Sequence, residues 1–245
     1  MRFCVCIKQV PDLSAAVQTG RLVLNAYDAS AVEEALVLTA AHGGSVDLVL
    51  VGPDSAKETI RKALAMGADS ATHIQLADVA DLDSYAVASI LAEHLNGASY
   101  DVIAVGKQSQ DTDAGLAGSM LAERLGWPYA SNAVALAADS ARGCLVVTRQ
   151  GDSGQEILEL TMPCVVTCSN DMNDPRIPSL RGIMDAKKKP VTDAAPASVA
   201  PGRPLTRVRS FEQVPPRDPG QILHGDPDDL VRQLVDRLGN EAKVF

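Results

Sequence analysis

The sequence DVIAVGKQSQDTDAG occupies residues 101–115 and joins a short apolar run to a polar loop that opens with a glycine. The run Asp101–Val105 alternates little between apolar and polar residues, which is typical of a strand covered on both faces in a parallel sheet. The loop leads into a helix that we expect to begin near Ala114. A strand, a loop and a helix in this order form one βα unit.

The same unit recurs towards the N-terminus. Apolar runs predict three further strands, at Arg2–Lys8, Val46–Val51 and His73–Leu76. Stretches of helical period predict the helices between them, at Val32–Ala40, Ser55–Met66 and Ser84–Leu95. We expect Glu33 and Glu34 in the first turn of the first helix, where the helix dipole favours acidic side chains. Repeated βα units predict a parallel sheet with helices on both faces.

Beyond Trp127 the pattern changes to consecutive strands. They are expected at Ala133–Ala138, Cys144–Arg149, Gln155–Leu160 and Cys164–Cys168. The turn Gly151–Gly154 joins the middle two as an antiparallel hairpin. We expect this block to extend the sheet or to lie at its edge.

Alanine and proline become frequent after about residue 190, which is typical of an extended arm. The arm ends in an amphipathic helix with Asp226 as its N-cap and Gly239 as its stop. The predicted fold class is α/β: a doubly wound, mainly parallel Rossmann-like sheet with helices on both faces and an antiparallel hairpin at the edge. We expect one domain over residues 1–189 and the extended C-terminal arm over residues 190–245.

Composition excludes several classes of function. The formal net charge of -9 and the pI near 4.9 oppose nucleic acid as a partner, because phosphate contacts need clustered Lys and Arg. No apolar run reaches the ~18 residues that a membrane span requires, so we expect no membrane span. The cysteines lack zinc-type spacing and most lie in apolar runs, which predicts buried thiols, no metal site and a cytoplasmic location.

Ligand sites in open parallel sheets lie at the carboxyl ends of the strands. Three loops occupy such positions: Lys8–Asp12, Gly52–Pro53 and Gly106–Asp113. The third loop precedes the small residues Gly115, Ala117 and Gly118, which would let a phosphate approach the backbone N–H groups of the helix. The alternative is that Asp113 caps the helix and the small residues pack on the strand.

No Walker A pattern, GxGxxG fingerprint, nucleophile elbow or HExxH motif occurs, and the four histidines are isolated in the sequence. We therefore expect no catalytic residues. A nucleotide-like site without catalytic machinery indicates a protein that binds its ligand and does not transform it.

Four segments resemble the beta subunit of electron transfer flavoproteins, the family that includes the FixA proteins. They are VCIKQVPD at residues 5–12, AVEEAL at 31–36, ETIRKALAMGAD at 58–69 and NDPRIPSLRGIMDAKKK at 173–189. The resemblance reaches to about residue 190, and the last two segments are highly specific to the family.

The resemblance implies an electron carrier without catalysis of its own, in a bacterial or archaeal cytoplasm. The beta subunit would pair with an alpha subunit, help to hold the FAD of that subunit, and bind AMP or a second FAD itself within residues 1–189. Electrons would come from acyl-CoA-type or other flavin dehydrogenases, or from NADH in bifurcating members, and would pass to a quinone reductase or another acceptor.

The resemblance also implies site residues. The matching cofactor-binding positions are Cys6, Asn25, Ala26, Tyr27, Asp28, Val51, Gly106, Lys107, Gln108, Ser109, Gln110, Asp111, Thr112, Asp113, Ala114, Gly115, Leu116 and Ala117. One departure concerns residues 115–117, where AMP-binding members carry Asn-Gln-Thr and this chain has Gly-Leu-Ala. It remains open whether AMP, FAD or neither of them occupies the site.

The segment Ile177–Ala186 resembles the loop with which the beta subunit recognises its dehydrogenases. Leu180 occupies the position of the anchoring leucine, and Ile177, Ile183 and Met184 would flank it. The alternative for Leu180 is an ordinary core residue beside a proline turn. Lys187–Lys189 would flank this loop or form a solvated helix end.

Two other functions are open. One is an ATP-hydrolysing or adenylylating enzyme of related fold, which the lack of a phosphate-gripping glycine motif disfavours. The other is a stand-alone nucleotide-sensing protein of the universal-stress type, which the lysine run and the C-terminal arm disfavour.

Overall fold

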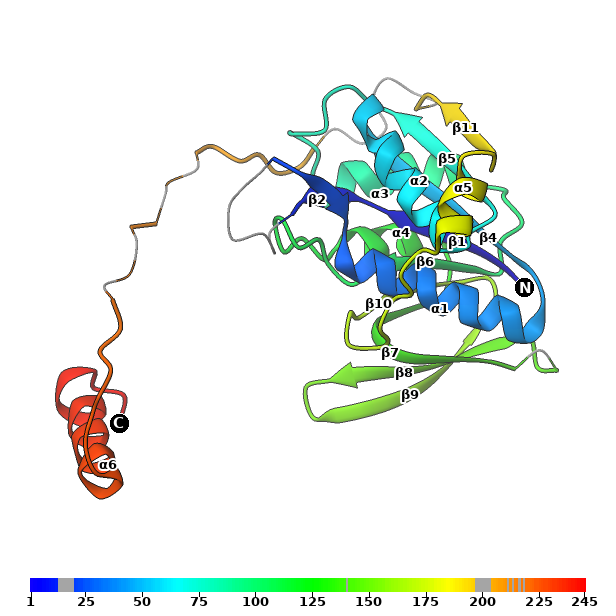
Figure 1. Ribbon diagram of the computed structural model, residues 1–245. Coiled ribbons are helices and arrows are strands. Elements are labelled where there is room, and N and C mark those ends of the chain that lie inside the picture. Colours follow the sequence, from blue (N-terminus) through cyan, green and yellow to red (C-terminus); the bar gives the residue numbers. More distant parts are fainter. Residues whose placement is uncertain are drawn as a thin grey trace. The chain divides into compact units, whose positions relative to one another are not determined.

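The computed structural model describes residues 1–12, 20–139, 141–196, 204–210, 212, 214–215, 217 and 219–245. It divides into two compact units, Met1–Arg207 and Val208–Phe245. The first unit contains a nine-stranded sheet, a two-stranded sheet and five α-helices among its described residues (Figure 1).

The strands of the large sheet follow the order β11-β5-β4-β1-β6-β10-β7-β8-β9. Their bounds are β1 Arg2–Ile7, β4 Ser45–Gly52, β5 Ser70–Gln75, β6 Val102–Gly106, β7 Tyr129–Asp139, β8 Cys144–Gly151, β9 Gly154–Thr161, β10 Cys164–Cys168 and β11 Val191–Ala194. From β11 through β10 to β7, each strand pairs in parallel with its neighbour in this order. The pairs β7–β8 and β8–β9 are antiparallel. The mainly parallel sheet and its edge hairpin are confirmed.

The helices cover both faces of this sheet. Their bounds are α1 Ala26–His42, α2 Lys57–Met66, α3 Ser84–Leu95, α4 Ala117–Leu125 and α5 Leu180–Ala186, and a 3-10 turn, η1, spans Asp54–Ala56. α1 and α2 bury their apolar residues in one cluster with Phe3 and Val5, whereas α3 and α4 share a second cluster with Cys4 and Cys6. The alternate side chains of β1 thus face opposite layers, as the pleat requires.

The central strands are the ones that alternate least in sequence. β1 lies between β4 and β6, with Cys6 opposite Val49 and Val105. All five residues of β6 are buried. All five cysteines are buried and free, as the apolar runs predicted.

Several boundaries differ from the expectation. α1 begins at Ala26, so the placement of Glu33 and Glu34 in a first turn is wrong. The earlier start was hidden because the first two turns carry buried polar residues, among them Asp28 and Ser30, where an apolar stripe would normally stand. Glu33 lies mid-helix, and its carboxylate accepts from Arg176 Nε at 2.7 Å and Nη2 at 2.8 Å.

The block after Trp127 extends the sheet beyond β6 to its edge, as expected. Its last strand in sequence, β10, lies nearest to β6, between β6 and β7. β7 pairs in parallel with β10 over Tyr129–Ala133 and antiparallel with β8 over Ala133–Asp139. Asn132, with a φ of 56°, lies where these two parts meet.

Three short strands were not predicted. β2 Gln9–Pro11 and β3 Leu22–Leu24 form the small antiparallel sheet. β11 falls in the segment expected to be an arm and pairs in parallel with β5. The assignment of residues 1–189 to a nucleotide-binding domain stays a prediction.

Among its described residues, the second unit contains one α-helix, α6, at Pro227–Asp236. Asp226 accepts the backbone N–H of Asp228 at 3.1 Å, so the predicted cap is confirmed. The helical backbone continues as a π-helical turn, η2, over Arg237–Glu241, so Gly239 is not its stop. None of the described helices is long and apolar enough to cross a membrane.

Candidate functional site

The loop between β6 and α4, residues 107–116, is tied to the start of α1. The Asn25 side chain donates from Nδ2 to the Gln108 carbonyl at 2.9 Å, and its Oδ1 accepts the Gln110 N–H at 3.0 Å. The Gln110 side chain in turn accepts the N–H of Ala26 at 3.0 Å. Two of the predicted site segments therefore form one hydrogen-bonded structure.

Asp28 in α1 also connects the start of this helix to the residue directly before the loop, Gly106. One carboxylate oxygen accepts the Lys8 N–H at 2.7 Å and the other accepts the Gly106 N–H at 3.0 Å. A Cβ at residue 106 would overlap Asp28 Oδ1 and lie 2.8 Å from the Tyr27 Cβ, so only glycine fits there. This buried carboxylate joins the carboxyl ends of β1 and β6 to the first turn of α1.

Burial raises the pKa of Asp28 to about 7, against hydrogen bonds from Asn25, Lys8 and Gly106 that favour the ionised form. The folded chain therefore holds this proton at pH values where the unfolded chain, with an ordinary Asp pKa, has lost it. We expect the free energy of unfolding to fall as pH rises from about 4 to about 7, by at most about 1.4 kcal/mol per pH unit from this group. Asp28→Asn should remove that contribution.

Denaturant unfolding of the full-length chain at a series of pH values measures this effect. Asp81→Asn, which changes an exposed carboxylate, is the matched control and should leave the slope unchanged. Equal slopes in Asp28→Asn and in the unmodified chain would show that Asp28 does not titrate in this range.

Lys8 connects the first and third ligand loops. Its ammonium donates to both carboxylate oxygens of Asp111, at 2.8 and 2.9 Å. Burial opposes ionisation of Asp111, but Lys8 and the Ser109 hydroxyl hold the pKa of its carboxyl below the usual range. Lys8 was not among the predicted site residues, although its place directly after β1 was the signal that could have identified it.

The loop is closed by its own hydrogen bonds, and Asp113 does not cap the helix. The Asp113 N–H donates to the Ser109 carbonyl at 2.8 Å, and its carboxylate accepts from Gln108 Nε2 at 3.0 Å. α4 begins at Ala117 and not near Ala114, and its N-cap residue Leu116 provides no side-chain acceptor. The capping alternative for Asp113 is wrong, and the first N–H groups of α4 receive no side-chain cap.

Gly118 has a packing role. A Cβ there would overlap Thr167 Cγ2 on β10. The residue thus brings α4 close to the sheet, as the packing alternative expects, and its role in admitting a phosphate stays a prediction.

The remaining predicted cofactor residues lie at the same edge of the sheet. Cys6, near the end of β1, is buried in the cluster that contains α3 and α4, and Val51, near the end of β4, packs against that cluster. Ala114, Gly115 and Leu116 are exposed between the closed loop and α4. Their role in binding a ligand stays a prediction.

The predicted partner-binding residues are all exposed. The exposed fractions of their side chains are Ile177 92%, Leu180 83%, Ile183 45% and Met184 66%. Leu180 is the first residue of α5, whose cap residue Ser179 accepts the Gly182 N–H at 3.0 Å. The core alternative for Leu180 is therefore wrong.

Cationic side chains join α5 and the following residues to α2. Arg61 Nη1 donates to the carbonyls of Ala186 and Lys189 at 2.6 and 2.7 Å. The Lys189 ammonium donates to the carbonyls of Leu64, Gly67 and Ala68 at the end of α2. Lys187 and Lys188 are exposed, but Lys189 is not part of a solvated helix end. Spacing along the chain gave no signal for this contact.

No three residues able to hold a metal ion lie together in the described part of the chain. A family model described as electron transfer flavoprotein domain matches residues 13–199.

Curated relatives match over nearly their whole length. The chain is 33% identical over 255 residues to the electron transfer flavoprotein subunit beta of Syntrophomonas wolfei, covering 100% of this chain and 98% of the relative. It is 34% identical over 259 residues to the protein of the same name from Bradyrhizobium diazoefficiens, covering 100% of both chains. It is 32% identical over 259 residues to the caffeyl-CoA reductase-Etf complex subunit CarD of Acetobacterium woodii, covering 97% of this chain and 98% of the relative.

Proposed function

This chain belongs to the electron transfer flavoprotein family as a beta subunit, and from that premise we propose that it acts as half of a heterodimeric electron carrier. The other half is an alpha subunit, whose FAD this chain helps to hold. The heterodimer accepts electrons from flavin dehydrogenases, or from NADH if it is bifurcating. It passes them to a quinone reductase or another acceptor in the cytoplasm of a bacterium or archaeon.

The observation that carries the nucleotide part of this proposal is the uncapped N-terminus of α4 beside a closed loop. Asn25, Asp28 and Gln110 hold the loop in place, so its shape does not depend on the ligand. Preorganised N–H groups at a helix N-terminus bind phosphate without a basic side chain. This fits a chain in which Gly115, Leu116 and Ala117 replace the polar residues of other members.

The residues that fit an adenylate are those of the loop, together with Cys6 and Val51 at the ends of neighbouring strands. The ligand is AMP, or a second FAD in its place, with its phosphate on the backbone N–H groups of α4. The flavin supplies the redox chemistry when it is bound. This chain binds and orients the nucleotide and shields it from solvent. Asn25 and Asp28 position the loop and do not exchange electrons.

The acyl-CoA-type dehydrogenase partner draws on the name of the Acetobacterium relative, a subunit of a caffeyl-CoA reductase-Etf complex. An apolar docking surface for such a partner is available in α5 and in Ile177, two residues before the cap residue Ser179. Leu180, Ile177 and Met184 expose more than half of their side-chain surface there. Exposed aliphatic side chains gathered on one element are typical of an interaction surface. The enzyme and stress-protein alternatives have no comparable support.

Leu180→Ala should lower the rate of electron transfer from an acyl-CoA dehydrogenase by about tenfold or more and leave the flavin content of the heterodimer unchanged. The reason is that the substitution removes an anchor of more than about 1.4 kcal/mol without touching the nucleotide loop. The measurement is flavin reduction in the purified heterodimer at limiting dehydrogenase concentration.

Ile157→Ala is the matched control, since Ile157 is 72% exposed on β9 at the other edge of the sheet. It should transfer electrons at the unmodified rate. Loss of flavin in Leu180→Ala would give α5 a structural role, and an unchanged rate would remove it from the docking surface.

A further inference from the structure

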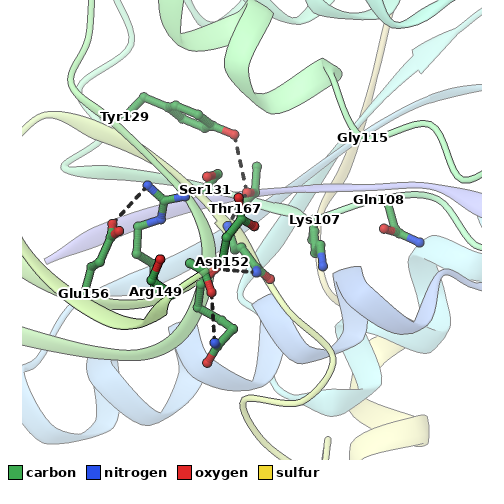
Figure 2. Close-up of a pocket in the computed structure, with 13 residues that line it drawn as sticks. Lys107, Gln108, Gly115, Tyr129, Ser131, Arg149, Asp152, Glu156 and Thr167 are labelled. Atoms are coloured by element: carbon green, nitrogen blue, oxygen red, sulfur yellow. Dashed lines mark hydrogen bonds and ion pairs between the residues drawn. The ribbon is translucent and has the colours of Figure 1, made fainter.

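A polar cavity of about 510 Å³ lies on the side of the loop that faces β10, β7 and the β8–β9 hairpin. Figure 2 shows Tyr129 and Arg149 towards one side of it, Lys107 and Gln108 towards the other, and Thr167 between them. Lys107 and Gln108 belong to the loop of the proposed nucleotide site. The strand and hairpin residues are not among those proposed to hold the nucleotide.

Arg149 enters this cavity with incomplete hydrogen bonding. Its Nη1 lies 3.3 Å from a carboxylate oxygen of Glu156. Its Nε is buried and has no acceptor. A buried guanidinium N–H without a partner is unfavourable, and an anion that reorients the group would supply the missing acceptor.

Lys107 supplies a second positive charge. Its backbone N–H is bound to the Cys168 carbonyl at 2.8 Å, which holds this end of β6 against β10. Its ammonium has no ion-pair or hydrogen-bond partner among the residues that the structure describes. Two cations on opposite sides of one cavity stand out in a chain with a net charge of -9.

Hydroxyl groups occupy the space between the two cations. The Thr167 oxygen accepts the Asn132 N–H at 3.1 Å, and the Tyr129 hydroxyl lies 3.5 Å from the same oxygen. One of these hydroxyls donates to the other, so the pair keeps one hydrogen that can be donated to a ligand. The acidic lining residues, Asp152 and Glu156, are exposed, and Glu156 is already paired with Arg149.

We propose that this cavity binds a small dianionic oxyanion, a phosphate or a dicarboxylate, between Lys107 and Arg149. Hydrogen bonds from a cation to such an oxygen are stronger than neutral ones, and two cations complement two negative charges. Lys107, Gln108 and Gly115 are shared with the proposed nucleotide loop, whereas Arg149, Tyr129 and Thr167 are not among the residues proposed to hold the adenylate.

Isothermal titration of the purified heterodimer, with its flavin and nucleotide content recorded, tests this site. Inorganic phosphate is the first probe, malonate represents the dicarboxylates, and chloride is the monoanion control. We expect saturable binding of one phosphate or one malonate per beta chain, and tenfold or greater weakening in both Lys107→Gln and Arg149→Gln.

Arg142→Gln is the matched control and should bind as the unmodified protein does. Arg142 lies between β7 and β8 and, like Arg149, pairs with a glutamate of β9, in this case Glu159. It does not line the cavity. Phosphate bound only at the N-terminus of α4 would be insensitive to Arg149→Gln, and that result would overturn the proposal.

Two further outcomes would also overturn it. One is the absence of saturable binding of either probe at millimolar concentration. The other is dissociation of the two subunits in Arg149→Gln but not in Arg142→Gln without any anion binding, because the cavity would then receive an acidic side chain of the alpha subunit. Lys107→Gln keeps the proposal testable if the Arg149 variant fails to fold.

Discussion

Gly106→Ala is expected to empty the nucleotide site and to lower the free energy of unfolding by about 3 kcal/mol or more. The added methyl group would overlap the Asp28 carboxylate and crowd the side chain of Tyr27. To make room, Asp28 must give up its hydrogen bonds to the N–H groups of Lys8 and Gly106 while remaining buried. The join between β1, β6 and α1 would open, and the loop that follows Gly106 would lose its position.

Chemical denaturation of the heterodimer and the adenylate content after denaturation measure both effects. Gly220→Ala is the control, because a Cβ at residue 220 meets nothing within 4 Å and its φ lies outside the left-handed region. A Gly106→Ala protein with normal stability and normal nucleotide content would show that the Asp28 junction does not support the site.

Lys189→Met should lower the free energy of unfolding by about 1.5–3 kcal/mol and slow electron transfer from the dehydrogenase. The Lys189 ammonium donates to three backbone carbonyls at the end of α2, at 3.1, 3.1 and 2.7 Å. Methionine keeps the apolar stem but removes the ammonium that these three carbonyls share, and only the Leu64 carbonyl has the Gly67 N–H as a further donor outside the helix and strand ladders. The segment carrying Leu180 would lose one of its two cationic attachments to α2.

Thermal unfolding and the flavin-reduction assay, applied to the same protein, check this prediction. Lys187→Met removes an exposed ammonium two residues away and should change neither quantity. If Lys187→Met and Lys189→Met behaved alike, the lysines would act through net charge and not through the α2 carbonyls.

The local sequence pattern was sufficient to predict the bounds of elements that have clear start and stop residues. Cys164–Cys168 was predicted with its observed bounds because this mainly apolar run stands between a proline and a polar segment. Ser84–Leu95 was also predicted with its observed bounds, since Asp83 accepts the Ala86 N–H at 2.9 Å as a cap and Asn96-Gly97 ends the helix. Periodicity and end signals agree at these two elements.

Elements that depend on distant partners could not be predicted in this way. β11 is four residues long and is a strand only because it pairs with β5, whose residues precede it by more than a hundred positions. The antiparallel pair of β2 and β3 has three residues in each strand and no periodicity. No local pattern indicated the position of β10 between β6 and β7.

The candidate site divides in the same way. The loop after β6 was predicted because the carboxyl end of a parallel strand is where ligands bind. The contact between Asp28 and Gly106 spans 78 positions, and the pair of Glu33 and Arg176 spans 143, so neither has a local signature. Lys107 was predicted as a cofactor residue, whereas Arg149 was assigned only to a hairpin strand, and no local pattern indicated that the two line one cavity.

The adenylate content of the heterodimer tests the central claim most directly. The chain would be co-expressed with an alpha subunit, the complex purified and denatured, and the released FAD and AMP counted. The account predicts either one FAD and one AMP per heterodimer, for an ordinary carrier, or two FAD without AMP, for a bifurcating one. A complex that releases only the single FAD of the alpha subunit, with no second nucleotide, would contradict it.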